Sequence, residues 1–154
     1  MSNSLQHLAR TNWKYRLFHY APMLKNYLGD NADDMLDEFL LYADINKLSL
    51  DWRFHFYFLN WLASQKEVPV AIAEHCLVAC VTRWSLSGLD HVASQGVVLM
   101  SRCLPSVAII FWKSEALSEA GKVSRVTLLN VLKQDAVAFI TKEQKLSEAN
   151  WLAL

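Results

Sequence analysis

The segment from Trp52 to Trp61 constrains the fold more than any other part of the chain. A helix that is apolar around its whole circumference must be enclosed by other elements. This segment and the residue after it leave almost no polar side, because they include Trp52, Phe54, Phe56, Tyr57, Phe58, Leu59, Trp61 and Leu62. We therefore predict a central, enclosed helix from Trp52 to about Gln65, with Ser49 or Asp51 as its N-cap.

The rest of the chain is also interpreted as helical, from apolar spacing and from residues that begin or end helices. Val107–Trp112 is rich in β-branched and aromatic residues and is the one segment for which a buried strand is an alternative. No second segment with alternating apolar residues offers it a partner, so helix is the favoured interpretation. The expected helices cover residues 4–20, 31–45, 69–87, 90–100, 105–112 and 124–140, with a short helical turn over 23–28 that ends at Gly29.

These segments predict an all-α fold of about seven helices, arranged as an irregular multi-helix bundle or a short stack of helical hairpins. The chain has 154 residues, the usual size of one domain, and only 4 Gly and 3 Pro, which leaves little room for linkers. We expect residues 1–154 to form a single domain.

Charge and composition exclude several classes of protein. The 15 basic and 15 acidic side chains cancel, so no net positive field favours nucleic acid. Arg102 and Pro105 interrupt the longest weakly charged stretch, which makes a membrane span unexpected. The N-terminal ten residues lack the apolar stretch of a signal peptide, and three cysteines are an odd number, so we expect a cytoplasmic protein with cysteine thiols.

The cysteines and the glycines are the residues that could form a metal site or a nucleotide site. Cys76 and Cys80 would share one face of a helix, with Glu74, His75, His91 and Cys103 as further ligands. Cysteine in an unbroken apolar helix usually behaves as a small hydrophobic residue, so we expect no metal. The glycines at 29, 88, 96 and 121 are too far apart for a phosphate-binding loop, and we expect no cofactor.

Catalytic candidates are few. His19 and His55 lie among aromatic residues, where a histidine could have a perturbed pKa, but no matching carboxylate pattern accompanies either one. We expect no catalytic residues. The alternative is a helical small-molecule-binding protein or enzyme with a pocket around Trp52, Arg53 and His55.

An acidic cluster is the most specific surface feature. It contrasts with the preceding helix, whose charged residues are basic. The acidic side chains could stabilise the N-terminal end of a helix through its dipole, or they could bind a basic surface on a partner. The cluster consists of Asp30, Asp33, Asp34, Asp37 and Glu38. We therefore predict a non-enzymatic, cytoplasmic protein-binding module of the inhibitor or immunity, adaptor or chaperone type, whose partner is another protein.

Overall fold

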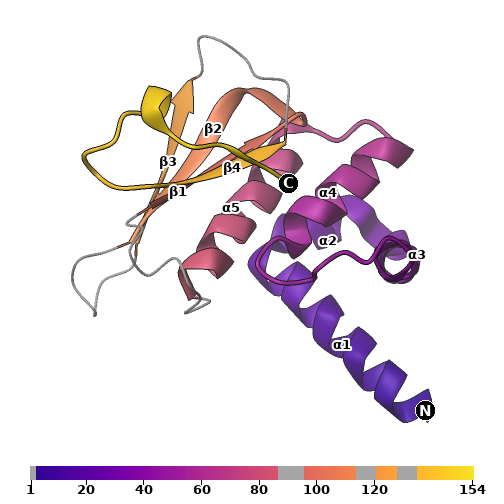
Figure 1. The fold of residues 1–154 in the computed structure, drawn as a ribbon. Helices are drawn as coiled ribbons and strands as arrows, with labels where there is room; N and C mark the ends of the chain where they lie inside the picture. Colours follow the sequence, from indigo (N-terminus) through magenta and orange to yellow (C-terminus); the bar gives the residue numbers. More distant parts are fainter. Residues whose placement is uncertain (1–2, 87–95, 114–120, 128–134) are drawn as a thin grey trace. The chain divides into compact units, whose positions relative to one another are not determined.

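The computed structural model describes residues 3–86, 96–113, 121–127 and 135–154. Contacts between residues divide the chain into two compact units, residues 1–79 and 80–154. The first unit is helical, and the second holds the end of the last helix and a β-sheet (Figure 1). Each unit is described by itself.

The helical unit contains the helices that the first half of the sequence predicts. Pro22 begins a short helix that closes at Gly29, whose φ of 62° is easily adopted by glycine. Pro69 immediately precedes the last helix, and its fixed φ suits a residue at the start of a helix. The helices are α1 (Asn3–Tyr20), α2 (Pro22–Leu28), α3 (Ala32–Ile45), α4 (Phe54–Gln65) and α5 (Val70–Leu86), with a 3-10 turn at Gly29–Asn31.

The α4 helix is enclosed, as the Trp52–Trp61 segment predicts. Seven of its residues are buried, among them three phenylalanines. Phe39 of α3 packs its ring against the rings of Phe54, Phe58 and Trp61, with centroid distances of 5.7, 5.2 and 5.8 Å. Aromatic pairs at such distances add to the stabilisation from burial, so this cluster holds α3 against α4.

The α3 helix ends in a capping motif that glycine usually closes. Leu48 donates its backbone N–H to the carbonyl of Ala43, and Lys47 donates its own to the carbonyl of Asp44. This pair of bonds is the Schellman arrangement, which needs a left-handed residue after the helix. Lys47 takes that position with a φ of 53°.

The predicted all-α fold of seven helices is wrong, because the second unit is built on a five-stranded sheet. Strands take the place of the described parts of the helices predicted over 90–100, 105–112 and 124–140, while residues 90–95 and 128–134 of those predictions lie outside the described residues. A 3-10 turn at Leu146–Glu148 follows the fourth strand. Ser87, Gly88 and Asp90, which mark predicted helix ends, lie outside the described residues. The strands are β1 (Gly96–Ser101), β2 (Leu104–Trp112), β3 (Lys122–Thr127), β4 (Ala136–Ile140) and β5 (Leu152–Ala153).

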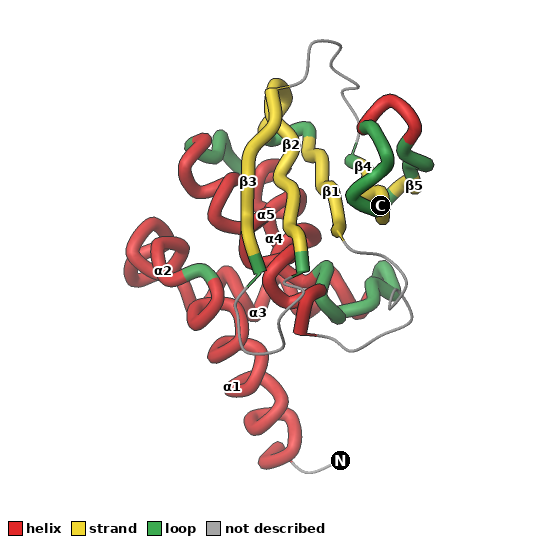
Figure 2. Tube along the Cα trace, turned by 90° about the vertical axis from the view of Figure 1, so that its left-hand side faces the viewer, coloured by secondary structure: helices red, strands yellow, loops and turns green. Residues whose placement is uncertain are grey.

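The sheet is antiparallel, with the strand order β3-β2-β1-β4-β5 (Figure 2). The first strand is therefore central, and it is buried at all six positions. Arg102, in the tight turn between β1 and β2, donates two hydrogen bonds to the side chain of Asp135. Its backbone N–H and its Nε donate to the two oxygens of that carboxylate at 2.9 and 3.2 Å.

Both faces of the sheet are covered within the second unit. On one face, Trp84 of α5 packs on Phe139 of β4 at a ring distance of 5.8 Å. On the other face, Leu146, Ala149 and Trp151 of the C-terminal segment pack against an apolar cluster. That cluster consists of Val98, Met100, Ala108, Ile110, Ala136, Ala138 and Ile140.

Across the described residues, the helices are too short or too polar to cross a membrane.

Candidate functional site

The predicted acidic cluster is divided by the fold. Asp33 and Asp37 turn toward α1 and form ion pairs with Lys14 at 2.7 Å and with Arg10 at 2.6 Å. The hydrogen bond from Lys14 and its positive charge hold the pKa of the Asp33 carboxyl below its ordinary value. These two acids thus use their charge to join α1 to α3.

The other three acids of the cluster, Asp30, Asp34 and Glu38, are exposed. Asp30 lies in the 3-10 turn before α3, and the other two lie on α3 itself. Sequence reasoning found these acids but could not separate them from the paired ones, because their positions relative to α1 are a tertiary property.

The residues of the alternative pocket have structural roles. Trp52 is buried, and Arg53 binds the Asp51 carboxylate through two hydrogen bonds of 3.0 and 2.9 Å. His55 is fully buried, with its Nε2 2.9 Å from the carbonyl oxygen of Leu17. The other candidate histidine, His19, is exposed and stacks on Tyr15 with the ring centroids 5.0 Å apart.

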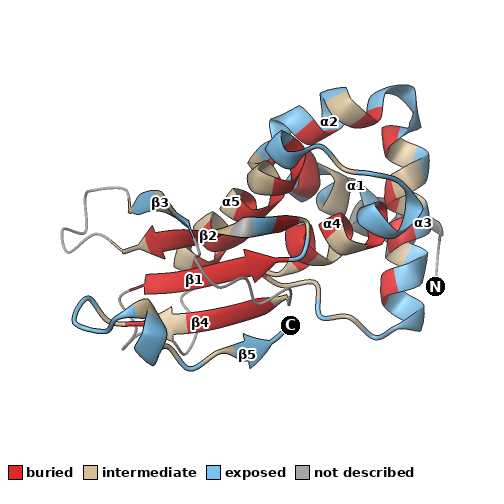
Figure 3. Cartoon of the chain, turned by 90° about the horizontal axis from the view of Figure 1, so that it is seen from above, coloured by how far each residue is buried: buried red, intermediate tan, exposed pale blue. Residues whose placement is uncertain are grey.

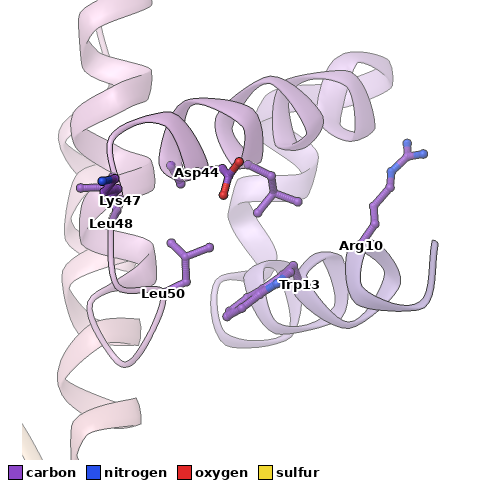
Figure 4. Close-up of a pocket in the computed structure, with 8 residues that line it drawn as sticks. Arg10, Trp13, Asp44, Lys47, Leu48 and Leu50 are labelled. Atoms are coloured by element: carbon purple, nitrogen blue, oxygen red, sulfur yellow. The ribbon is translucent and has the colours of Figure 1, made fainter. Parts of the chain in front are cut away.

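A cavity of about 700 Å³ lies elsewhere in the helical unit, between α1, α3 and the loop after α3 (Figure 4). Trp13 and Leu50 form part of its apolar wall, and Arg10, Asp44 and Lys47 supply its charges. Its size is within the usual range of ligand pockets. Trp52, Arg53 and His55 are not among the residues that line it.

The residues considered as metal ligands, for which the sequence predicts no metal, lie on α5 and after β1 where the structure describes them. Cys76 and Cys80 are fully buried in α5, and Cys103 follows β1 and is only partly buried. Among the residues that the structure describes, no three His, Cys, Asp or Glu side chains are placed to hold a metal ion together. His91 lies outside those residues.

Sequence reasoning missed the outer edge of β3, which is called the open edge because no further strand lies along it among the described residues. All six residues of β3 pair with β2, from Lys122 opposite Trp112 to Thr127 opposite Val107. Along its other edge the structure describes no strand, and β3 is more exposed than the strands at the centre of the sheet (Figure 3). Ser124, the first residue of the helix predicted over 124–140, lies within this strand.

The two edges of the sheet differ in length. β5, at the opposite edge, has only two residues. A very short edge strand offers few backbone groups to another chain, which is one way in which proteins avoid unwanted strand pairing. β3 has six, and it carries two basic side chains, Lys122 and Arg125. Val123 and Val126 are three residues apart, a spacing that suits a helix and not an alternating strand, so no local signal identifies β3 from the sequence.

Comparison with known proteins gives one family. Residues 3–153 match the family described as methanobactin biosynthesis cassette protein MbnC-like. A search of curated proteins found no significant match. The family description indicates a biosynthetic role, and it overturns the interpretation of the chain as an inhibitor or immunity protein.

Proposed function

Because the chain belongs to the MbnC-like family, we propose that it serves methanobactin biosynthesis as a non-catalytic component that binds an extended peptide segment along β3. The observation that carries this proposal is the six-residue edge of β3, along which the described part of the chain places no other strand. The peptide belongs to another protein that takes part in the same biosynthesis.

Main-chain hydrogen bonds are the first source of affinity. In an antiparallel strand, successive residues direct their backbone groups to opposite edges, so half of those on β3 point away from β2. An added strand pairs with these groups without any change in the sheet, which is the basis of recognition by strand addition. Six residues match the usual length of a strand in globular proteins.

Side chains on β3 determine which peptide fits. Lys122 and Arg125 point to opposite faces of the strand because they are an odd number of residues apart. A peptide with acidic residues opposite these bases gains from complementary charge on either face. Val123 is exposed and offers an apolar contact, whereas Val126 packs against the apolar cluster of the sheet, so the expected segment is acidic with an apolar residue near Val123.

The proposal that the chain is not an enzyme is supported by what its candidate catalytic groups do. His55 contacts a main-chain carbonyl, and Arg53 is held by Asp51. Burial raises the pKa of the Cys103 thiol, although a hydrogen bond with Ser101 opposes this effect, so the thiol is a weak nucleophile near neutral pH. All three cysteines are thiols, which supports the further proposal of a cytoplasmic location.

Paired proline variants of β3 test strand addition. The N–H groups of Val123 and Ser124 point to opposite edges, so Val123→Pro and Ser124→Pro differ in which edge they disrupt. One variant loses a bond to β2 and melts at a lower temperature. The other keeps the wild-type melting curve and loses only the open edge.

Binding is measured by fluorescence anisotropy with labelled ten-residue peptides that tile the other proteins encoded in the cassette. We expect one acidic segment to bind, and the folded proline variant to bind it at least tenfold more weakly, a loss of about 1.4 kcal/mol. Backbone amides of β3 should become protected from hydrogen exchange when that peptide is present. Equal affinity of the folded proline variant and the wild type would refute strand addition.

A further inference from the structure

The α3 helix presents large apolar side chains on its solvent side as well as on its buried side. Leu41 and Ile45 are 62% and 68% exposed, and Tyr42 beside them is 41% exposed. Leu36, Phe39 and Ala43 form the buried side, as expected for an amphipathic helix. Exposed apolar residues that gather on one surface usually mark an interaction site.

The exposed residues form a regular stripe. Asp34, Glu38, Leu41 and Ile45 are spaced by four, three and four residues, which at about 100° per residue places them within an arc of about 60°. All four are exposed. The first half of this outer stripe is acidic and the second half is aliphatic.

The outer stripe is separate from the acids that join α3 to α1. Asp33 and Asp37 lie on the flank of the helix and are paired with Lys14 and Arg10. Replacing residues of the outer stripe therefore leaves these ion pairs in place. The stripe can be tested without loss of the contacts that hold the helical unit together.

We propose that the outer stripe docks an amphipathic helix of a second protein of the methanobactin cassette. The partner helix carries aliphatic residues three or four apart, which pack on Leu41 and Ile45. It carries Lys or Arg one to two turns away, opposite Asp34 and Glu38. The four-residue stripe thus specifies where the basic residues of the partner helix lie relative to its aliphatic residues.

A second copy of this chain fits the stripe less well. It would bring the same two acids, Asp34 and Glu38, and not the bases that complement them. Two aliphatic side chains also bury far less than the roughly 1,200 Å² of a standard stable interface. A helix from a different protein, which adds contacts elsewhere, satisfies both conditions.

Site-specific photo-crosslinking tests the partner. A benzophenone amino acid replaces Leu41 in the full chain, co-expressed with the other cassette proteins, and the matched control carries it at Val70. Val70 is also an exposed aliphatic residue, 61% accessible, at the start of a different helix. The crosslinked residue is then identified by mass spectrometry.

The expected result is a crosslink from position 41 to an apolar helical residue of one cassette protein, with Lys or Arg one to two turns away. Three results overturn the proposal. They are a crosslink mainly to a second copy of this chain, a crosslink to a segment without that pattern, and a yield at position 41 no higher than at position 70.

Charge reversal then tests whether the partner places basic residues opposite Asp34 and Glu38. Against the crosslinked protein, Asp34→Lys with Glu38→Lys should slow association at least tenfold at low salt, and 0.5 M salt should remove most of the difference. Unchanged association, with the wild-type circular dichroism spectrum retained, overturns the assigned charge pattern. The variants of β3 lie in the other unit, so failure of strand addition and failure of helix docking are distinguishable.

Discussion

Replacing Lys47 by glycine is expected to stabilise the helical unit. Lys47 closes α3 with a φ of 53°, a left-handed conformation that costs an L-residue about 1 to 2 kcal/mol. Glycine adopts this conformation without that cost. It also adds freedom to the unfolded chain, which offsets about 0.4 to 1 kcal/mol of the gain. The net expectation is that Lys47→Gly raises the free energy of unfolding by up to about 1.6 kcal/mol, with a central value of about 0.8 kcal/mol.

Urea unfolding followed by circular dichroism at 222 nm measures this difference. Lys47→Ala is the matched control, because alanine loses the same charge from the cavity rim but keeps the Cβ that makes the conformation unfavourable. We expect the glycine variant to be the most stable of the three proteins. If it unfolds at the same urea concentration as the alanine variant, the backbone conformation of Lys47 does not limit stability and the reasoning is wrong.

Three further predictions concern single side chains. Trp61→Ala should lower the free energy of unfolding by about 3 to 5 kcal/mol, because Trp61 is buried against two aromatic rings; a wild-type urea curve would contradict this. Burial raises the pKa of Asp51, but hydrogen bonds and charge from Arg53 outweigh it, so the pKa lies below the ordinary 3.8. The Asp51–Arg53 pair therefore stabilises the fold fully at pH values above the ordinary pKa of 3.8. This stabilisation is lost as the pH falls through the lower pKa that Asp51 has in the folded protein. Thermal melts should show that Arg53→Gln has a shallower loss of stability below about pH 4 than wild type, and parallel profiles would contradict it. Cys103 should react slowly with iodoacetamide at pH 7 and much faster above its raised pKa, as followed by mass spectrometry; a rate at pH 7 equal to that of an unstructured cysteine peptide would be inconsistent with a raised pKa.

Helices in the first half of the chain are predictable because each signal is local. Pro22, Gly29 and Pro69 mark helix boundaries that the structure contains, and the Trp52–Trp61 segment identifies the enclosed helix. These signals depend on spacing within one element. Tertiary contacts then reinforce what the sequence already favours.

The central strand was missed because a strand that is buried on both faces has no alternating apolar pattern. β1 is buried at all six positions, so its apolar run resembles one side of a helix. β2 was recognised as a possible strand over Val107–Trp112 but lacked a visible partner, since β1 and β3 were both interpreted as helices. Strand pairing is a long-range property, and one misread strand removes the evidence for its neighbours.

The candidate sites show the same division between local and long-range information. The acidic cluster is visible in the sequence, but which acids pair with α1 depends on how two helices meet. The open edge of β3 depends on the order of all five strands. Asp34 and Glu38 were therefore predicted, and the edge was not.

The central place of β1 has a consequence for how the protein is made. β1 is the first strand to leave the ribosome, and it can form its hairpin with β2 at once, because their residues are close in sequence. Its other edge must wait for β4, which pairs Ile140 with Gly96. Until then the nascent chain carries an apolar strand with an unpaired edge, which is a site for aggregation. Slowing translation between these two strands should therefore lower the yield of native protein more than slowing it after β4.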